Sequence, residues 1–132
     1  MKIRVYYEDT DAGGIVYHSR YINFCERARS EEFFRRGMMP FGEERSGFVV
    51  RQIEADFLGM ARLGDLLEVR TEIVEEQRSA VRLRQSIHRN GEEIFVMKIL
   101  LVYVVAGRPK RIPAELLEVV RALEGAPNRS DS

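Results

Sequence analysis

The sequence is poor in the residues that build disulfides and metal centres. Its 132 residues include one cysteine and two histidines. A single cysteine excludes an intramolecular disulfide and a thiolate metal cluster, and two histidines are too few for a histidine-rich metal site. We therefore predict a protein of a reducing compartment that has no metal site.

The chain also lacks net charge and long hydrophobic runs. Its 21 basic residues balance 21 acidic ones, so no overall charge favours nucleic acid or an anionic membrane as a partner. The longest apolar run, Ile99 to Ala106, is far shorter than the roughly 18–20 residues of a membrane span. The N-terminal stretch turns acidic where an export signal would be apolar. These absences predict a cytoplasmic protein with no nucleic-acid partner and no membrane span.

Several common functional motifs are missing as well. The sequence contains no Walker A loop, dinucleotide fingerprint, His-Glu-x-x-His zinc helix or nucleophile elbow. We therefore predict that the protein uses no cofactor.

The composition nevertheless supports a real hydrophobic core. Hydrophobic residues make up 45% of the chain, which is enough for a domain of this length without staples. We expect a single domain over residues 1–124, followed by a flexible C-terminal tail over residues 125–132.

The first half of the chain predicts one strand and one long helix. Alternating apolar residues favour a strand from Lys2 to Glu8. A helical pattern runs from Ser19, a candidate N-cap, to Arg36, just before Gly37. Its apolar positions are so many that we expect burial over much of its circumference. A loop over 37–47 follows.

The second half predicts four strands and a short helix. The strands are Phe48–Leu58, Leu66–Glu75, Ala80–Arg89 and Glu93–Val105. Asn90-Gly91 is a strong hairpin signal, residues 107–110 form another turn, and Pro113 opens a helix to about Leu123. This order is typical of an α+β domain in which an antiparallel sheet wraps a single helix, and whose sheet faces and edges are natural places to dimerise.

One short stretch, "YYEDTDAGGIVYHSRY", carries the strongest candidate for chemistry. Asp9 and Asp11 are typical of a turn before a helix. Asp11, however, lies beside Gly13 and Gly14, which allow close backbone approach, and a few residues before free helix N–H groups. A carboxylate next to a group that can polarise a carbonyl is the minimum for acyl transfer.

The neighbouring residues leave alternatives open. His18 is either a solvated residue at the helix start or a group that orients water or substrate. A Cys25–His18 dyad is conceivable at a spacing of two helical turns, but a cysteine among Ile22, Phe24 and Ala28 is more typical of a buried core residue. Basic residues in the second half, above all "GRPKR" at 107–111, suit the phosphates of a ligand.

The stretch from residue 6 to residue 29 resembles a known family signature. Tyr7, Asp9-Thr10-Asp11, the run from Gly14 to His18, Tyr21 and Glu26-Arg27-Ala28-Arg29 resemble the 4-hydroxybenzoyl-CoA thioesterase family, most closely its YbgC-like acyl-CoA thioesterase branch. The likeness continues through "DFLGMARLGDLLEVRTEI", "RNGEEIFVMKILLVYVV" and "GRPKRIPAEL" and so covers about residues 3 to 120.

The resemblance implies a hotdog fold, in which a curved five-stranded antiparallel sheet wraps one long helix and a short C-terminal helix follows. It implies a homodimer or a homotetramer that hydrolyses acyl-CoA, or an acyl group on acyl carrier protein, at sites between subunits. The catalytic carboxylate of the family falls on Asp11, assisting residues fall on Tyr7 and His18, and the His18 N–H would polarise the thioester carbonyl. Our predicted substrate-binding residues are Gly14, Tyr17, Arg62, Arg108, Lys110 and Arg111.

Two other functions remain open on the sequence. The chain could be a module that binds acyl groups on CoA or acyl carrier protein without hydrolysing them. A hotdog dehydratase is a weaker third possibility, because its usual histidine-based signature is missing here.

Overall fold

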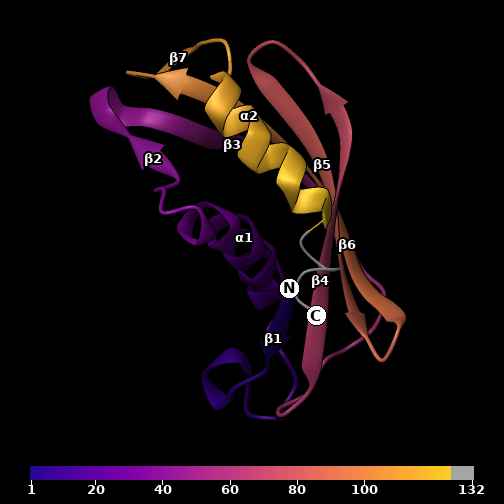
Figure 1. The fold of residues 1–132 in the computed structure, drawn as a ribbon. Helices are drawn as coiled ribbons and strands as arrows, with labels where there is room; N and C mark the ends of the chain where they lie inside the picture. Colours follow the sequence, from indigo (N-terminus) through magenta and orange to yellow (C-terminus); the bar gives the residue numbers. More distant parts are fainter. Residues whose placement is uncertain (126–132) are drawn as a thin grey trace.

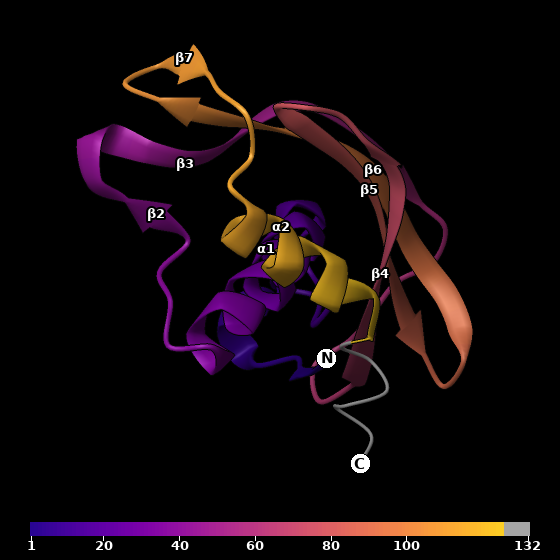
Figure 2. The same cartoon turned by 45° about the horizontal axis from the view of Figure 1, so that its top comes forward.

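The structure, a computed structural model, describes residues 1–125, and these form a curved antiparallel sheet that wraps around two helices. The sheet order is β1-β4-β5-β6-β3-β2, and β7 pairs with the end of β6. Figure 2 shows both helices inside the curve of the sheet. The strands are β1 (Lys2–Arg4), β2 (Phe41–Gly42), β3 (Ser46–Phe57), β4 (Leu66–Glu76), β5 (Ala80–Arg89), β6 (Glu92–Val105) and β7 (Arg108–Pro109). The predicted α+β class and hotdog architecture are thereby confirmed.

The number of strands differs from the expected five because of two very short ones. β2 lies in the stretch predicted as a loop, and β7 lies in the stretch predicted as a turn. Each has only two residues and pairs antiparallel with the strand next to it in sequence: β2 pairs with β3, and β7 pairs with β6. Segments this short carry no alternation pattern, so the sequence could not reveal them.

The first strand is shorter than predicted. β1 ends at Arg4, and the chain then forms a 3₁₀ turn over Tyr7–Asp9. Ile3 and Val5 are both buried, as the alternation indicates. The pairing stops because the chain turns at Tyr6, where the Asp9 carboxylate accepts a hydrogen bond from the Tyr6 N–H.

The long helix α1 (His18–Arg35) confirms the prediction except at its start. Ser19 lies inside the helix, and Tyr17 is the N-cap without any side-chain hydrogen bond, so the predicted Ser19 cap is wrong. The far end is as expected: Gly37 has φ +70°, and the N–H groups of Gly37 and Met38 bond to the carbonyls of Phe34 and Phe33.

The predicted hairpin turn is confirmed, and the predicted C-terminal helix is confirmed apart from its first residue. Asn90 and Gly91 have φ of 52° and 82° and join β5 to β6. The short helix α2 (Ala114–Ala122) has Pro113 as its N-cap rather than its first residue, and a 3₁₀ turn (Leu123–Gly125) follows. Within residues 1–125, no helix is long and apolar enough to cross a membrane.

The core lies between the concave face of the sheet and one face of α1. That face of the helix contributes Tyr21, Phe24, Cys25 and Ala28, and the central strand β5 contributes Val81, Leu83, Gln85 and Ile87. The helix is therefore buried on one face, and the expected burial over much of its circumference is wrong, because part of its remaining apolar surface lines a cavity described below. Of the predicted flexible tail, residues 126–132 lie outside the described residues.

Candidate functional site

A tight turn between Thr10 and Val16 presents the residues of the first motif. The two end residues bridge each other, and Gly14 takes the positive φ of 76° that the reversal of the chain requires. The turn is fixed against the loop before β4: Val16 N–H donates to the Ala61 carbonyl, and Leu63 N–H donates to the Gly14 carbonyl. These two hydrogen bonds fix the turn to the loop before β4.

Asp11 lies at the start of this turn and is exposed to solvent. Its Oδ1 accepts hydrogen bonds from the N–H groups of Gly13 at 2.8 Å and Ile15 at 3.4 Å. The turn-forming role of Asp11 is therefore real, and it fixes the direction of the carboxylate without burying it. A carboxylate held in one orientation and open to solvent can meet a ligand.

Asp9, two residues earlier, is in the opposite situation. Its carboxylate is almost wholly buried, and Oδ2 accepts from the Tyr6 N–H at 3.0 Å. Its backbone carbonyl accepts from the Tyr17 N–H, just before the long helix. Asp9 therefore ties the two ends of the motif together, as expected of a turn-shaping residue.

The N-terminus of α1 lies where this motif ends. His18 is its first residue, and the first N–H groups of a helix have no partner within the helix. Because the N-cap residue Tyr17 makes no capping hydrogen bond, these donors are not taken by a side-chain cap. The His18 ring lies 4.4 Å from the Tyr17 ring and 6.3 Å from the Phe57 ring at the end of β3, measured between centroids.

Two further predicted residues lie at this end of the molecule. Arg62 forms a β-bridge with Ile15, so it belongs to the wall of the turn. Tyr7 lies in the 3₁₀ turn before Asp11 and is 81% exposed. The buried Tyr21 supports the same region, because its hydroxyl accepts a hydrogen bond from the Ala61 N–H at 2.9 Å.

The three remaining basic residues lie elsewhere. Arg108 belongs to β7, and Lys110 and Arg111 follow it directly. Figure 1 places β7 at the top of the molecule and β1, with the turn that follows it, at the bottom. Within one chain the fold does not bring these cations to Asp11.

The structure does not support a cysteine nucleophile. Cys25 is wholly buried in the core, where burial raises the pKa of its thiol to about 12. A reactive cysteine needs the opposite, an accessible thiol whose pKa is lowered. Of the two alternatives for Cys25, the core residue is the correct one.

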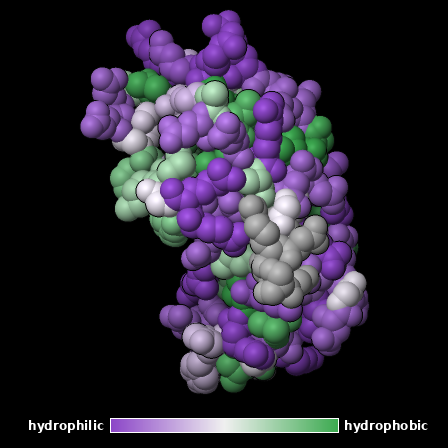
Figure 3. Space-filling view, in the orientation of Figure 1, coloured by the Kyte–Doolittle hydropathy of each residue, from purple (hydrophilic) through white to green (hydrophobic). Residues whose placement is uncertain are grey.

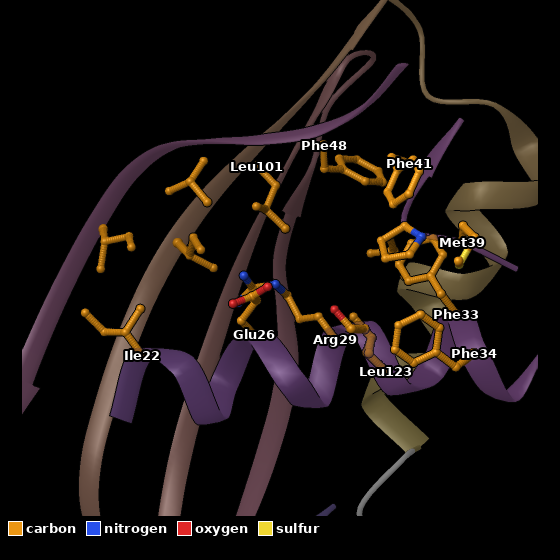
Figure 4. A pocket seen from close by; sticks show the side chains of 16 residues that line it. Ile22, Glu26, Arg29, Phe33, Phe34, Met39, Phe41, Phe48, Leu101 and Leu123 are labelled. Carbon is orange, nitrogen blue, oxygen red and sulfur yellow. The ribbon is translucent and has the colours of Figure 1, made fainter. Parts of the chain in front are cut away.

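A cavity along α1 was not found by sequence reasoning. It has a volume of about 600 Å³ and lies between α1, α2 and the concave face of β3 and β6. Glu26 and Arg29 point into it from the helix (Figure 4). Glu26 and Arg29 are three residues apart, which predicts that they share one face of the helix. This spacing alone does not reveal a cavity, because the opposite wall comes from other elements.

Comparison with known families gives one family. The model of the thioesterase-like superfamily matches residues 5–120. An acyl-CoA thioesterase YbgC of Helicobacter pylori is 52% identical over 88 residues, 67% of this chain and 65% of the relative, so this chain spans just under two thirds of that length. An acyl-CoA thioester hydrolase YbgC of Escherichia coli is 38% identical over 124 residues, covering 87% of this chain and 90% of the relative.

Solved structures agree with these relatives. A thioesterase of Thermus thermophilus, complexed with coenzyme A and Zn, is 31% identical, with a TM-score of 0.75 over 95% of this chain and 93% of that one. A probable thioesterase of Bartonella henselae is 32% identical, with a TM-score of 0.79 over 86% and 97% of the two chains. The resemblance first seen in the turn and helix motif is confirmed.

Proposed function

The chain belongs to the thioesterase-like superfamily, and on that premise we propose that it hydrolyses acyl-CoA thioesters to the free acid and CoA. The names of the relatives from Helicobacter pylori and Escherichia coli support this activity, as does the coenzyme A bound to the Thermus thermophilus structure. The observation that carries the proposal in this chain is the exposed, oriented Asp11 carboxylate in the turn that leads into α1.

Hydrolysis of a thioester requires few catalytic groups. The leaving group is a thiol, with a pKa near 8.5 if cysteine is the guide, so it departs largely as thiolate without a strong general acid. No serine has to be activated and no amine has to be protonated, so a Ser-His-Asp arrangement is unnecessary. One carboxylate and one group that polarises the carbonyl are sufficient.

We assign these two tasks to Asp11 and to the N-terminus of α1. The His18 N–H donates a hydrogen bond to the thioester oxygen and stabilises the negative charge that develops there. Asp11 acts either as nucleophile or as general base. As nucleophile it forms a mixed anhydride while the C–S bond breaks, and water then hydrolyses the anhydride; as base it takes a proton from the attacking water.

Residues around the turn complete the proposed site. Tyr7 and the His18 side chain assist Asp11, while Gly14, Tyr17 and Arg62 bind the substrate. Solvent ¹⁸O that enters Asp11 during a single turnover would favour attack by the carboxylate, and its absence would favour the water mechanism.

We also propose that the working form contains at least two copies of this chain. Within residues 1–125, the edge of β3 is open beyond its short pairing with β2. Pairing of two β3 strands would join two sheets and place a site between subunits. In such an assembly Arg108, Lys110 and Arg111 could bind the CoA phosphates of a neighbouring chain. A tetramer of two such dimers remains a prediction.

The test compares two isosteric carboxylate-to-amide variants of the same segment. Asp11→Asn keeps an oxygen that can accept the Gly13 and Ile15 hydrogen bonds, so the turn is preserved. We expect a fall in kcat of roughly 10²–10⁴-fold with acyl-CoA binding retained. Glu8→Gln, an exposed neighbour with no assigned role, should hydrolyse like the wild type. Hydrolysis by Asp11→Asn at the wild-type rate would refute the role of Asp11.

A thiol-release assay over a panel of acyl-CoA esters separates hydrolysis from the alternative function. Release of CoA with Asp11-dependent kinetics supports the thioesterase. Tight binding of acyl-CoA without any released thiol would instead identify a binding module, which needs the same pocket without the chemistry.

A further inference from the structure

The cavity along α1 has the size and shape of a ligand site. Its volume of about 600 Å³ lies within the range of roughly 300–1,000 Å³ typical of small-molecule pockets. Apolar side chains line most of it, among them Phe33, Phe48 and Leu101 (Figure 4). Apolar residues also gather at the molecular surface around β2 and the end of α1, on the left of Figure 3; exposed residues of this segment are Phe34, Met39 and Phe41.

One face of α1 leads from the proposed catalytic centre into this cavity. His18, Ile22, Glu26, Arg29 and Phe33 follow one another at intervals of three or four residues, which places them on the same side of the helix. All of these except His18 line the cavity. This face of α1 therefore runs from the proposed position of the thioester, at His18, into the cavity.

The concave face of β3 forms the opposite wall over the same length. Phe57 lies beside the His18 ring, and Ile53, Val50 and Phe48 line the cavity further along the strand. An acyl chain whose carbonyl lies at the start of α1 would thus have apolar side chains of β3 along its whole course.

Two charged side chains interrupt this apolar lining. The Arg29 guanidinium donates a hydrogen bond to Gln85 Oε1 at 2.7 Å, and the Gln85 amide donates to Thr71 Oγ1 and to the Cys25 carbonyl. These buried partners hold the guanidinium in place. Burial lowers the pKa of Arg29 from its ordinary value, but an arginine remains charged in proteins.

The Arg29 guanidinium interacts electrostatically with Glu26, whose charge opposes the lowering of the Arg29 pKa by burial. Within residues 1–125, no ion pair within 4.0 Å involves its guanidinium. Glu26 points into the same cavity from one helical turn earlier (Figure 4). The cavity therefore offers a hydrogen-bond donor and a hydrogen-bond acceptor close together in otherwise apolar surroundings.

We propose that this cavity receives the acyl chain of the substrate and that Glu26 and Arg29 select an aliphatic acyl group with a hydroxyl toward its far end. A hydroxyl can donate to the Glu26 carboxylate and accept from the Arg29 guanidinium at the same time. A methyl end would leave both charged groups without that partner. A carboxylate end would add a second negative charge where the Glu26 charge already acts on Arg29. The proposal rests on the thioesterase function proposed above.

The helix sets the length of the preferred acyl group. Glu26 and Arg29 lie eight and eleven residues after His18, which corresponds to roughly 12 and 16 Å along the helix axis. Acetyl and benzoyl groups are too short to reach them. The preferred substrate is therefore a medium or long aliphatic hydroxyacyl thioester.

The first experiment measures kcat/KM for three matched esters, dodecanoyl-CoA, ω-hydroxydodecanoyl-CoA and ω-carboxydodecanoyl-CoA. We expect the hydroxylated ester to be preferred over the plain one by about tenfold or more, because hydrogen bonds to charged groups are among the stronger ones. The carboxylated ester should be the poorest. Equal values for all three esters would overturn the proposal.

Variants then assign the preference to residues. Arg29→Met should abolish the preference for the hydroxyl, and Arg29→Lys should restore part of it by returning the charge. Glu26→Gln should raise kcat/KM for the carboxylated ester. Arg27→Met is the matched control: Arg27 is exposed on α1 and lies outside the cavity lining, so the ratio between esters should not change.

The ratio between two esters measured on one enzyme does not depend on how much of that enzyme is folded. An unchanged ratio in Arg29→Met would therefore contradict the proposal even if that variant were less stable. If no ester of the panel releases CoA, the thioesterase function itself fails. Release from every ester with no preference overturns only this inference.

Discussion

The two edges of the sheet differ in how far other segments cover them within residues 1–125. The β4 edge is closed. β1 pairs with Leu66–Glu68, the Met1 carbonyl accepts from the Val69 N–H, and Glu124 accepts from the Ile73 N–H. Arg121 of α2 then forms an ion pair with Glu76 at 2.8 Å. Both ends of the described chain thus serve to cover one edge strand.

The β3 edge is left open. On this side β3 pairs, within residues 1–125, only with β2 at Ser46 and Gly47, and the following ten residues have no strand beside them. Val49, which does not line the cavity, is 41% exposed on this strand. An uncovered edge strand is a candidate site of association, and this difference between the edges supports the dimer proposed above.

The largest effect should come from placing charge on the open edge. In a symmetric pairing of two β3 strands, Val49→Glu/Gln52→Glu adds like charges opposite each other and next to Glu54. We expect association to weaken by about 100-fold or more and hydrolysis to fall with it, as measured by sedimentation and thiol release.

The closed edge offers a matched control for this variant. Val74 and Gln77 have the same residue types and the same spacing, and both are exposed on or just after β4. Val74→Glu/Gln77→Glu should leave association unchanged. Dissociation by the control pair but not by the β3 pair would reverse the assignment of the two edges.

A smaller effect is expected from truncating one isoleucine on each edge. Ile53, Ile99, Leu83 and Ile73 form a single row across β3, β6, β5 and β4. Ile73→Ala should cost about 2 kcal/mol of unfolding free energy at any protein concentration. Ile53→Ala should cost about 1 kcal/mol in dilute solution and more where copies associate. Denaturant titrations at two concentrations test this, and equal, concentration-independent losses would contradict it.

The hydrogen bond at the closed edge should contribute less. Glu124→Ala removes the acceptor of the Ile73 N–H, and we expect a loss of about 1 kcal/mol. Hydrogen exchange should then quicken at the Ile73 amide. If exchange quickens at β3 amides to the same extent, the bond does not act locally at this edge.

The smallest effect concerns the Arg121–Glu76 pair. The hydrogen bond from Arg121 lowers the pKa of Glu76 below its ordinary value of 4.5. The carboxylate is charged in the folded protein at a pH where the unfolded chain already binds a proton. The contribution of the charged Glu76 to the free energy of unfolding is therefore present above pH 4.5 and is lost as the pH falls below that value.

Arg121→Gln should remove this dependence. The difference in unfolding midpoint between wild type and variant should be small at neutral pH, because the pair is exposed, and should vanish in acid. If this difference in unfolding midpoint grew as the pH fell, it would contradict a stabilising contribution from the Arg121–Glu76 ion pair.

Most of the fold could be predicted because its signals are local. The alternation in Ala80–Arg89 gave the bounds of β5 as the structure has them, and Asn90-Gly91 placed the hairpin. Two errors in element bounds lie where a specific hydrogen bond overrides the alternation or helical pattern. β1 ends early because Asp9 folds back on Tyr6, and α1 begins at His18 because the Tyr17 N–H bonds to the Asp9 carbonyl.

The candidate site was only partly predictable. Asp11, Gly14, Tyr17 and His18 lie together because they are neighbours in sequence, and Arg62 joins them through a β-bridge to Ile15. The basic cluster "GRPKR" could name Arg108, Lys110 and Arg111 as candidates for phosphate binding but could not place them. Glu26 and Arg29 were visible as part of a motif, yet their cavity depends on β3 and β6, which are distant in sequence.

The sequence by itself determined the main strands and helices, the turn that orients Asp11 and the membership of the family, because residue spacing and short-range hydrogen bonds fix these. Only the tertiary structure decided which edge of the sheet is closed, which cations lie far from Asp11 and which face of α1 meets an apolar wall. Those relations depend on the order β1-β4-β5-β6-β3-β2. Strand order is set by contacts between segments far apart in the chain, and no local pattern records it.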